Sequence, residues 1–203
     1  MKIGPKFKIA KRLGAPIFEK TQTQKFAASA ARVSSRVKKN VRPGQMSDYK
    51  RQLIEKQKMR FTYGITEKQL RKYVDEAIQK SANPTAFLMM RLESRLDNVA
   101  FRLGLAKTRR AARQMASHGH LVVNGRKMTI PSHQLKTGDV VSVREGSRAS
   151  QLFAHLNEEA AISTPAWLKL DQKKMEGKIE SQPIYEPAET LFDPEQVFEF
   201  YSR

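Results

Sequence analysis

The 203-residue sequence has no cysteine and only one tryptophan, and no stretch of it approaches the length of an apolar membrane span. Without cysteine, neither a disulfide nor a thiolate metal site can form. A membrane-crossing helix needs about 20 mostly apolar residues, and the first residues lack the apolar core of a signal peptide. These absences predict a cytoplasmic protein that stays off the membrane and is stabilised by burial of an apolar core.

Negative charge is also scarce, with 20 Asp and Glu against 38 Lys and Arg and a net charge of +18. An excess of this size repels itself unless a polyanion neutralises it, so a nucleic acid is the predicted partner. A basic surface kept only for solubility is the alternative. The sequence also lacks a phosphate-cradling glycine loop and a nucleophile–base arrangement, so we expect neither an enzyme nor a cofactor.

The charge is distributed unevenly along the chain. Residues 1–60 carry 17 Lys and Arg against 3 Asp and Glu, residues 61–90 carry 4 against 3, residues 91–150 carry 12 against 4, and residues 151–203 carry 5 against 10. We expect the two basic stretches to meet phosphates. We expect the acidic tail to fold back on the basic body or to face a neighbouring protein.

Helix signals follow one another after residue 46. Ser47 is positioned as an N-cap, Thr66 opens a capping box, and Asn83 precedes a proline that suits the first turn of a helix. A last short helix is predicted to start after Asp193. Trp167 is interpreted as a core anchor rather than a platform for base stacking.

Residues 94–145 combine helix and strand signals. The first helix is expected to end at Gly104 in the left-handed conformation, and Thr108 is expected to cap a second one. Asn124-Gly125 is the strongest two-residue hairpin signal, and a β-branched strand follows at residues 140–143. This order of helix, helix, hairpin and strand predicts a small α+β unit.

Cations and caps come together in residues 107–127. Arg109 and Arg113 are four apart and share a helix face, and the amides of the helix N-terminus add partial positive charge. Cations at fixed spacing suit the phosphates and 2′-hydroxyls of structured RNA better than base edges in a DNA groove. A solvated helix face is the alternative. The residues predicted to bind RNA, in this segment and in the basic front, are Lys6, Lys8, Lys11, Arg12, Arg32, Arg36, Arg42, Lys50, Arg51, Lys58, Arg95, Lys107, Thr108, Arg109, Arg110, Arg113, His118, His120, Asn124, Arg126 and Lys127.

The fold class predicted from these patterns is α+β. We expect a helical domain formed by the N-terminal half and the C-terminal tail, with an inserted α+β RNA-binding module of two short helices and antiparallel strands. The expected boundaries are a basic N-terminal arm over residues 1–45, a helical domain over 46–93 to which 163–203 return, and the module over 94–162. The arm has poor periodicity and is expected to become ordered on its nucleic acid. No metal site is expected, because His118 and His120 have no third ligand in view.

Two runs in the module resemble a known family. Residues 95–104 (RLDNVAFRLG) and 117–126 (SHGHLVVNGR) are similar to the two signatures of the RNA-binding module of the fourth small-subunit ribosomal protein. The resemblance is to the bacterial form and extends essentially from end to end. It continues in the runs GPK (4–6), RPGQ (42–45), SDY (47–49), EKQK (55–58), YG (63–64), WL (167–168), KMEG (174–177) and YS (201–202).

The resemblance implies a structural constituent of the small ribosomal subunit. Members of the family bind the small-subunit (16S-type) rRNA directly and early, at a multi-helix junction, and nucleate assembly of the subunit body. The resemblance also implies a monomer within the cytoplasmic ribosome that contacts the fifth small-subunit protein and lies near the channel through which messenger RNA enters. Roles in translational accuracy and in control of its own synthesis are further implications.

The sequence departs from the family pattern in two places. Many members carry a cysteine zinc site near the N-terminus, but Phe7 and Ala10 stand at its first Cys-x-x-Cys pair, so apolar packing or RNA contact is expected instead of zinc. Only Met46 separates Gln45 from Ser47, where many relatives have a longer basic loop; this shortens the segment that could reach messenger RNA. Two other classes stay open: an RNA-modifying enzyme or translational regulator that uses the same module, and a DNA-binding regulator.

Overall fold

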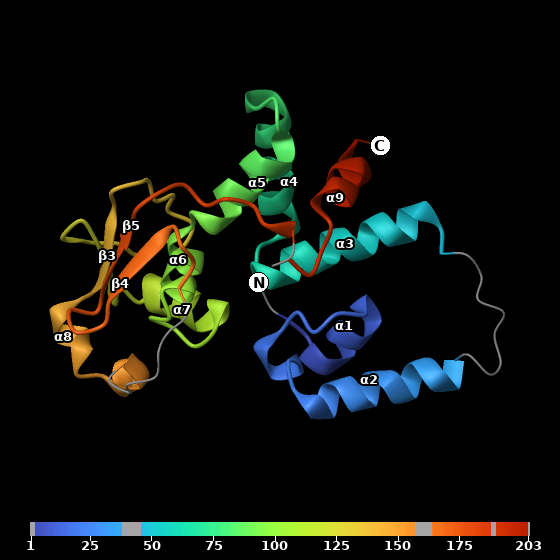
Figure 1. The fold of residues 1–203 in the computed structure, drawn as a ribbon, viewed down its shortest axis with the longest axis horizontal. Helices are drawn as coiled ribbons and strands as arrows, with labels where there is room; N and C mark the ends of the chain where they lie inside the picture. The colour runs from blue at the N-terminus through green and yellow to red at the C-terminus, as the bar shows by residue number, and fades with distance from the viewer. Residues whose placement is uncertain (1–2, 38–45, 157–163, 188–189, 203) are drawn as a thin grey trace. The chain divides into compact units, whose positions relative to one another are not determined.

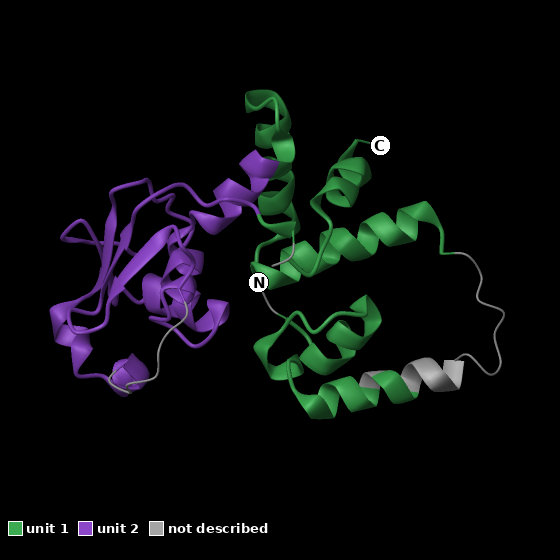
Figure 2. Cartoon of the chain, in the orientation of Figure 1, with its two compact units in different colours: residues 1–85, 186–203 green, residues 86–185 purple. Residues whose placement is uncertain are grey.

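The computed structural model describes residues 3–37, 46–156, 164–187 and 190–202, except for the side chains of residues 30 and 33–37. The chain divides into two compact units (Figure 2). Unit 1 consists of residues 1–85 and 186–203, and unit 2 consists of residues 86–185. Unit 1 is helical and unit 2 combines helices with an antiparallel sheet, which confirms the predicted α+β class.

Unit 1 consists of helices in the part that the structure describes (Figure 1). Two of the predicted caps are present: the Ser47 Oγ accepts the amide of Lys50 at 3.4 Å, and Thr66 forms a capping box with Gln69. These caps satisfy amides that a helix leaves without a partner in its first turn. The elements are α1 (Lys6–Leu13), the 3₁₀ helix η1 (Glu19–Thr21), α2 (Gln24–Val37), α3 (Asp48–Thr62), α4 (Glu67–Lys80), the start of α5 (Pro84–Glu93) and α9 (Pro194–Tyr201).

The N-terminal part of unit 1 has its own small apolar core. α1 ends at Gly14, whose φ of 69° lies in the left-handed region where glycine is not strained. Ile54 and Phe61 of α3 pack against this core. Its buried members are Ala10, Leu13, Ala15, Ile17, Phe18 and Phe26.

The C-terminal helix α9 docks on α3 and α4 within unit 1 (Figure 1). The rings of Tyr49 and Phe200 lie 5.7 Å apart, and the hydroxyl of Tyr201 donates to Glu67 Oε1 at 2.7 Å. The buried ammonium of Lys56 donates to the same oxygen at 2.7 Å and lies 4.2 Å from the centroid of the Phe200 ring. α9 therefore packs on the earlier helices of unit 1 through aromatic and charged contacts.

The pKa values around this junction follow from its contacts. Burial alone would raise the pKa of Glu67, but hydrogen bonds from Lys56 and Tyr201 and the charges of Lys56 and Arg60 outweigh it and hold the pKa below its ordinary value. Burial, followed by the hydrogen bond to Glu67, raises the pKa of the Tyr201 phenol far above its ordinary value. The junction therefore requires an ionised carboxylate and a neutral phenol.

Unit 2 packs helices against a five-stranded sheet (Figure 1). All strand pairs are antiparallel, in the order β2-β1-β3-β5-β4. One apolar cluster fills the space between the sheet and the helices, and Trp167 packs against it as predicted. Besides most of α5, the elements are α6 (Leu96–Arg102), α7 (Arg109–Ser117), β1 (Leu121–Val123), β2 (Arg126–Lys127), β3 (Val140–Val143), α8 (Glu145–Arg148), the 3₁₀ helix η2 (Gln151–Leu156), β4 (Leu168–Asp171) and β5 (Glu176–Ile179).

The boundaries of the units differ from the predicted ones. Residues 163–185 were expected to return to the helical domain, but β4 and β5 complete the sheet of unit 2, where β5 pairs with β3. Unit 2 also begins earlier, at Ala86, and includes most of α5. The described part of residues 1–45 is folded rather than an arm without its own structure, because its apolar residues meet α3.

Candidate nucleic-acid interface

The helix α7 begins after a tight turn and is capped. Gly104 is left-handed with a φ of 73°, and Thr108 Oγ1 accepts the amide of Ala111 at 3.1 Å. Both features were predicted from the sequence. Thr108 is thus used in capping, and the N-terminal end of α7 carries a partial positive charge beside the cations of that turn.

Buried carboxylates hold the arginines of α6 and α7 in place. Asp97 receives two bonds from Arg95, at 2.9 Å to Oδ1 and 2.7 Å to Oδ2, and its Oδ2 lies 3.8 Å from Nη1 of Arg113. Asn98 lies between the carboxylate of Glu93 and the guanidinium of Arg109. Its Oδ1 accepts from Arg109 at 2.8 Å, and its amide nitrogen donates to Glu93 Oε2 at 2.7 Å.

This network keeps a positive balance. Arg102 also donates to Glu93, at 3.0 and 3.2 Å, so three arginines share two carboxylates and Arg109 is held through Asn98. The guanidinium carbon of Arg109 lies 4.4 Å from the centroid of the Phe101 ring, which fixes its plane further. Arg113 is only 30% exposed. Arg109 and Arg113 are therefore held cations that reach the surface in part, and their orientation is set before any ligand binds.

Arg95 does not fit its predicted role as an RNA contact. Its side chain is 0% exposed and its guanidinium is paired with Asp97. A guanidinium without access to solvent cannot meet a phosphate, so Arg95 is instead a residue that positions Asp97. Lys58 of unit 1 is 16% exposed and donates to Glu55 at 2.7 Å, so it keeps partial access to solvent. Arg95 leaves the candidate set, and Lys58 stays a prediction.

The hairpin after α7 is fixed by its own side chains. Asn124 and Gly125 have φ values of 48° and 78°, as the predicted two-residue turn requires. Asn124 donates to Asp139 at 2.8 Å and accepts from the amide of Val140 at 2.9 Å. Since Asp139 also accepts the amide of Lys136 at 2.7 Å, the hairpin tip and the turn before β3 form one hydrogen-bonded unit.

Several exposed cations of unit 2 lie on this rigid frame. The Lys127 side chain passes so close to Gly119 that a Cβ there would collide with its Cε. His120 Nδ1 lies 2.9 Å from Ser147 Oγ and His118 is exposed, which fits polar residues rather than metal ligands. In the described part of the chain, no group of three or more His, Asp and Glu residues could hold a metal ion. The predicted residues that are exposed here are Lys107, Arg110, His118, Asn124, Arg126 and Lys127.

Two exposed cations next to the strands of the hairpin and β3 were not predicted from the sequence. Lys136 precedes the turn at Gly138-Asp139, and Arg144 follows β3 and donates its amide to the carbonyl of His120 at 2.9 Å. The sequence signal that could have identified them is a basic residue on each side of the Gly138-Asp139 turn and the strand that follows it. We add both to the candidate surface.

Unit 1 presents its cations differently. Lys8, Lys11 and Arg12 are exposed at positions i, i+3 and i+4 of α1, and so share one face. Lys11 donates to Ser29 at 2.6 Å, and Lys6 lies 5.5 Å from the centroid of the Phe18 ring. The remaining predicted cations with described side chains, all exposed, are Arg32, Lys50 and Arg51. Arg42 and the side chain of Arg36 lie outside the described residues.

Family models match both parts of this arrangement. A model described as S4 domain matches residues 94–141, and one described as Ribosomal protein S4/S9 N-terminal domain matches residues 1–93. The fold of unit 2, the exposed cations on the rigid frame and the match to the S4 domain model together define an S4-domain protein. In the described residues, no helix is long and apolar enough to cross a membrane.

Full-length relatives narrow the class to one family. The chain is 41% identical over 204 residues to the small ribosomal subunit protein uS4 of Roseiflexus castenholzii, covering 99% of this chain and 98% of the relative. It is 40% identical over 205 residues to the protein of that name in Chromobacterium violaceum, with the same coverage, and 41% identical to that of Persephonella marina, covering 98% of each chain. The chain belongs to the small ribosomal subunit protein uS4 family.

Proposed function

We propose that this chain is a structural component of the small ribosomal subunit that binds small-subunit rRNA directly and catalyses no reaction. The observation that carries the proposal is the rigid frame of α7 and the hairpin, from which exposed cations project. Phosphate contacts fix where a protein sits on a nucleic acid. A frame that is already ordered loses little conformational entropy when it meets a folded RNA.

The finer proposal concerns when and where the chain binds. We propose that it binds early, as a primary binder at a multi-helix junction, and nucleates assembly of the subunit body. Cations in both units support this, because two basic surfaces in one chain can hold two RNA segments. Contacts with the fifth small-subunit protein and with messenger RNA, a role in translational accuracy, and a monomeric state in the cytoplasmic ribosome belong to the same proposal.

Binding of the purified chain to small-subunit rRNA at increasing salt tests the proposal. With roughly 6–10 phosphate contacts, affinity should fall about 10³–10⁵-fold between 50 and 200 mM salt, by analogy with duplex DNA. A flat salt response would contradict it. Duplex DNA as competitor separates RNA binding from DNA binding, and a search for modified nucleotides after incubation tests for an RNA-modifying enzyme. Co-sedimentation of the tagged chain with the small subunit tests the location.

A further inference from the structure

Unit 1 contains a cavity between α1 and α3 of about 350 Å³. Ligand sites for small molecules typically measure about 300–1,000 Å³, so this one is large enough for a single nucleotide residue. Arg12 comes from α1, and Lys50, Leu53, Gln57 and the adjoining last turns come from α3. The cavity thus lies between two helices whose relative position is fixed by the core that Ile54 helps to close.

The charge of the cavity wall favours an anion. Arg12 and Lys50 are both exposed, and neither side chain has a hydrogen-bond or ion-pair partner among the described residues. Arg60 also lines the cavity, but its charge is partly balanced by Glu67, 3.3 Å away. The described lining includes no Asp or Glu. A phosphate at the rim would therefore meet two uncompensated cations.

The inner wall favours a flat, apolar group. Phe61 and Leu53 line it, and the guanidinium carbon of Arg60 lies 4.9 Å from the centroid of the Phe61 ring. Unstacked RNA bases are commonly held against aromatic rings and guanidinium planes. The wall therefore offers the two kinds of surface on which a nucleobase stacks.

Two polar atoms of the same wall have no partner. Gln57 Oε1 and Arg60 Nε are shielded from solvent and have no hydrogen-bond partner in the described residues. One is an acceptor and the other a donor, and a nucleobase edge carries a donor beside an acceptor. Gln57 lines the cavity, so a base edge that enters it could meet this side chain.

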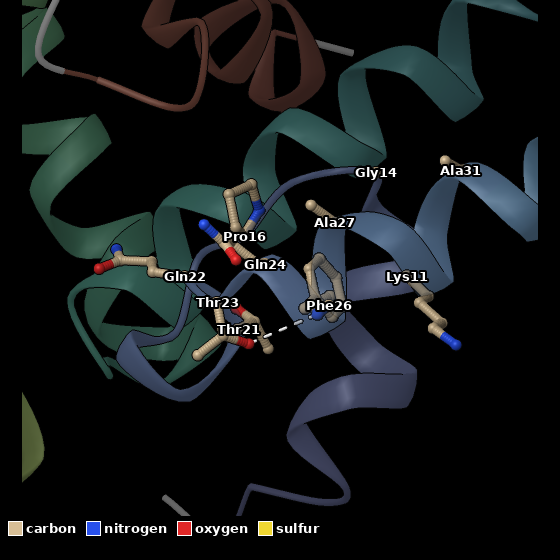
Figure 3. A pocket seen from close by; sticks show the side chains of 11 residues that line it. Lys11, Gly14, Pro16, Thr21, Gln22, Thr23, Gln24, Phe26, Ala27 and Ala31 are labelled. Atoms are coloured by element: carbon tan, nitrogen blue, oxygen red, sulfur yellow. Dashed lines mark hydrogen bonds between the residues drawn. The ribbon is translucent and has the colours of Figure 1, made fainter.

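A larger cavity of unit 1 lacks these features. It measures about 740 Å³ and lies between α1 and α2, with Phe26 and Ala27 in its wall (Figure 3). Among its described lining residues, Lys11 is the charged one, and its ammonium donates to Ser29. The described lining has no guanidinium beside an aromatic ring and no second cation for a phosphate, so the smaller cavity is the better candidate.

We propose that the α1–α3 cavity receives one nucleotide extruded from the bound RNA. Its base lies against Phe61 and Arg60 with its edge toward Gln57, and its phosphate lies between Arg12 and Lys50. The inference rests on the proposed function, because the nucleotide belongs to the rRNA that the chain binds. The cavity would thus recognise a single nucleotide, whereas the other proposed contacts of the chain are to phosphates.

Filling the cavity tests the proposal without changing its charge. Leu53→Trp would occupy the space for the base, and Leu191→Trp, at an exposed leucine of unit 1, is the matched control. Both are titrated with small-subunit rRNA, and the Watson–Crick edges of the RNA are probed chemically. Leu53→Trp should lower the affinity about tenfold, as expected from losing one stacked base. It should also expose one nucleotide that the unaltered chain protects, while the rest of the protected region stays.

The outcomes separate the two proposals. If Leu53→Trp keeps the affinity and every protected nucleotide, or weakens the whole protected region evenly, no nucleotide enters the cavity. If the unaltered chain does not bind rRNA, the proposed function fails instead. Should Leu53→Trp unfold by circular dichroism, the pair Gln57→Leu and Lys50→Gln takes its place. Loss of protection at the same single nucleotide in both supports the proposal, and unchanged protection overturns it.

Discussion

In unit 2, three arginines at α6 and α7 are paired with buried carboxylates, whereas in unit 1 Lys8, Lys11 and Arg12 lie exposed on one face of α1. The first arrangement fixes direction: Arg109 and Arg113 are held by Asn98 and Asp97 before a ligand arrives. The second places charge on long exposed side chains, one of which, Lys11, donates to Ser29. Cations held in place favour recognition of shape, and exposed ones contribute mainly attraction at longer range. The same chain thus offers two kinds of cationic surface.

The units also differ in how a single change should affect them. In unit 2 the guanidinium of Arg95 is fully buried, and Gly177 of β5 packs against Leu103 at the end of α6. A change at either place is therefore expected to destabilise the core of this unit. Unit 1 fastens its C-terminal helix through partly exposed contacts of Glu67, Tyr201 and Lys56. We therefore expect the largest effects on stability in unit 2 and the smallest at the α9 junction.

The largest effect is expected from Asp97→Ala. The change leaves the guanidinium of Arg95, which is 0% exposed, without its carboxylate. Loss of one partner of a buried ion pair typically costs about 3–5 kcal/mol. Trp167 packs against the core of unit 2 and is the one tryptophan, so its fluorescence during urea unfolding measures this. Glu180→Ala, which removes an exposed contact of 3.9 Å, is the control and should change stability by less than about 1 kcal/mol. If Asp97→Ala lowered the free energy of unfolding as little as the control, the buried Arg95–Asp97 pair would not be needed to hold the core of unit 2.

A somewhat smaller effect is expected from Gly177→Ala in β5. A Cβ at Gly177 would collide with the side chain of Leu103, which is fully buried against the sheet. Overpacking of this kind costs about 1–3 kcal/mol. Gly146→Ala in α8 is the matched control, because its Cβ would meet Arg144 at 3.8 Å, an ordinary contact. Tryptophan fluorescence should show a lower midpoint for the first variant alone; equal midpoints would mean that the sheet gives way at no cost.

The caps and turns around α7 and the β1–β2 hairpin could be predicted from neighbouring residues in the sequence. Strand pairing and burial could not, because they depend on residues far apart in the sequence. The cap at Thr108 and the turn at Asn124-Gly125 depend on neighbouring residues, and the structure has both. The β4–β5 hairpin was missed because its turn contains Met175 at a φ of 52° instead of an Asn-Gly pair. Its strands gain their place only by pairing with β3, far away in the sequence.

Sequence spacing also does not show which charged side chains are buried and which are exposed. Spacing alone does not reveal that Arg95 points into the core, because that depends on Asp97 being buried with it. The folding of residues 3–37 was underestimated for a related reason. Ala10 and Leu13 are few among many cations, and their core is complete only when Phe61 of α3 closes it.

The exposed cations should affect RNA binding without affecting stability. Arg110→Gln in unit 2 and Lys8→Gln in unit 1 each remove one exposed charge. If both contact phosphates, each should reduce the salt slope of rRNA binding by about one and leave the unfolding free energy within about 0.5 kcal/mol. Lys68→Gln, at an exposed lysine of α4, is the control and should leave the slope unchanged. An unchanged slope in Lys8→Gln alone would remove Lys8 from the phosphate-binding surface.

The smallest effect is expected at the α9 junction, and it depends on pH. The pKa of Glu67 is lower in the folded chain than in the unfolded one, so the unfolded state binds more protons near the ordinary value of 4.5. The stabilisation from Glu67 is therefore present above that value and is lost as the pH falls through the folded pKa.

Glu67→Gln separates this carboxylate from the other acids of the chain. The variant keeps the side-chain size but removes the charge that Lys56 and Tyr201 contact. Hydrogen exchange of the α9 amides, measured from pH 3 to 7, should show weaker protection in the variant at pH 7. It should also show a smaller loss of protection on acidification than in the unaltered chain. Glu195→Gln on α9, whose side chain is exposed, is the control and should keep the unaltered pH profile. Equal profiles in all three would mean that the apolar contacts of Phe200 and Val197, rather than the Glu67 charge, hold α9 in place.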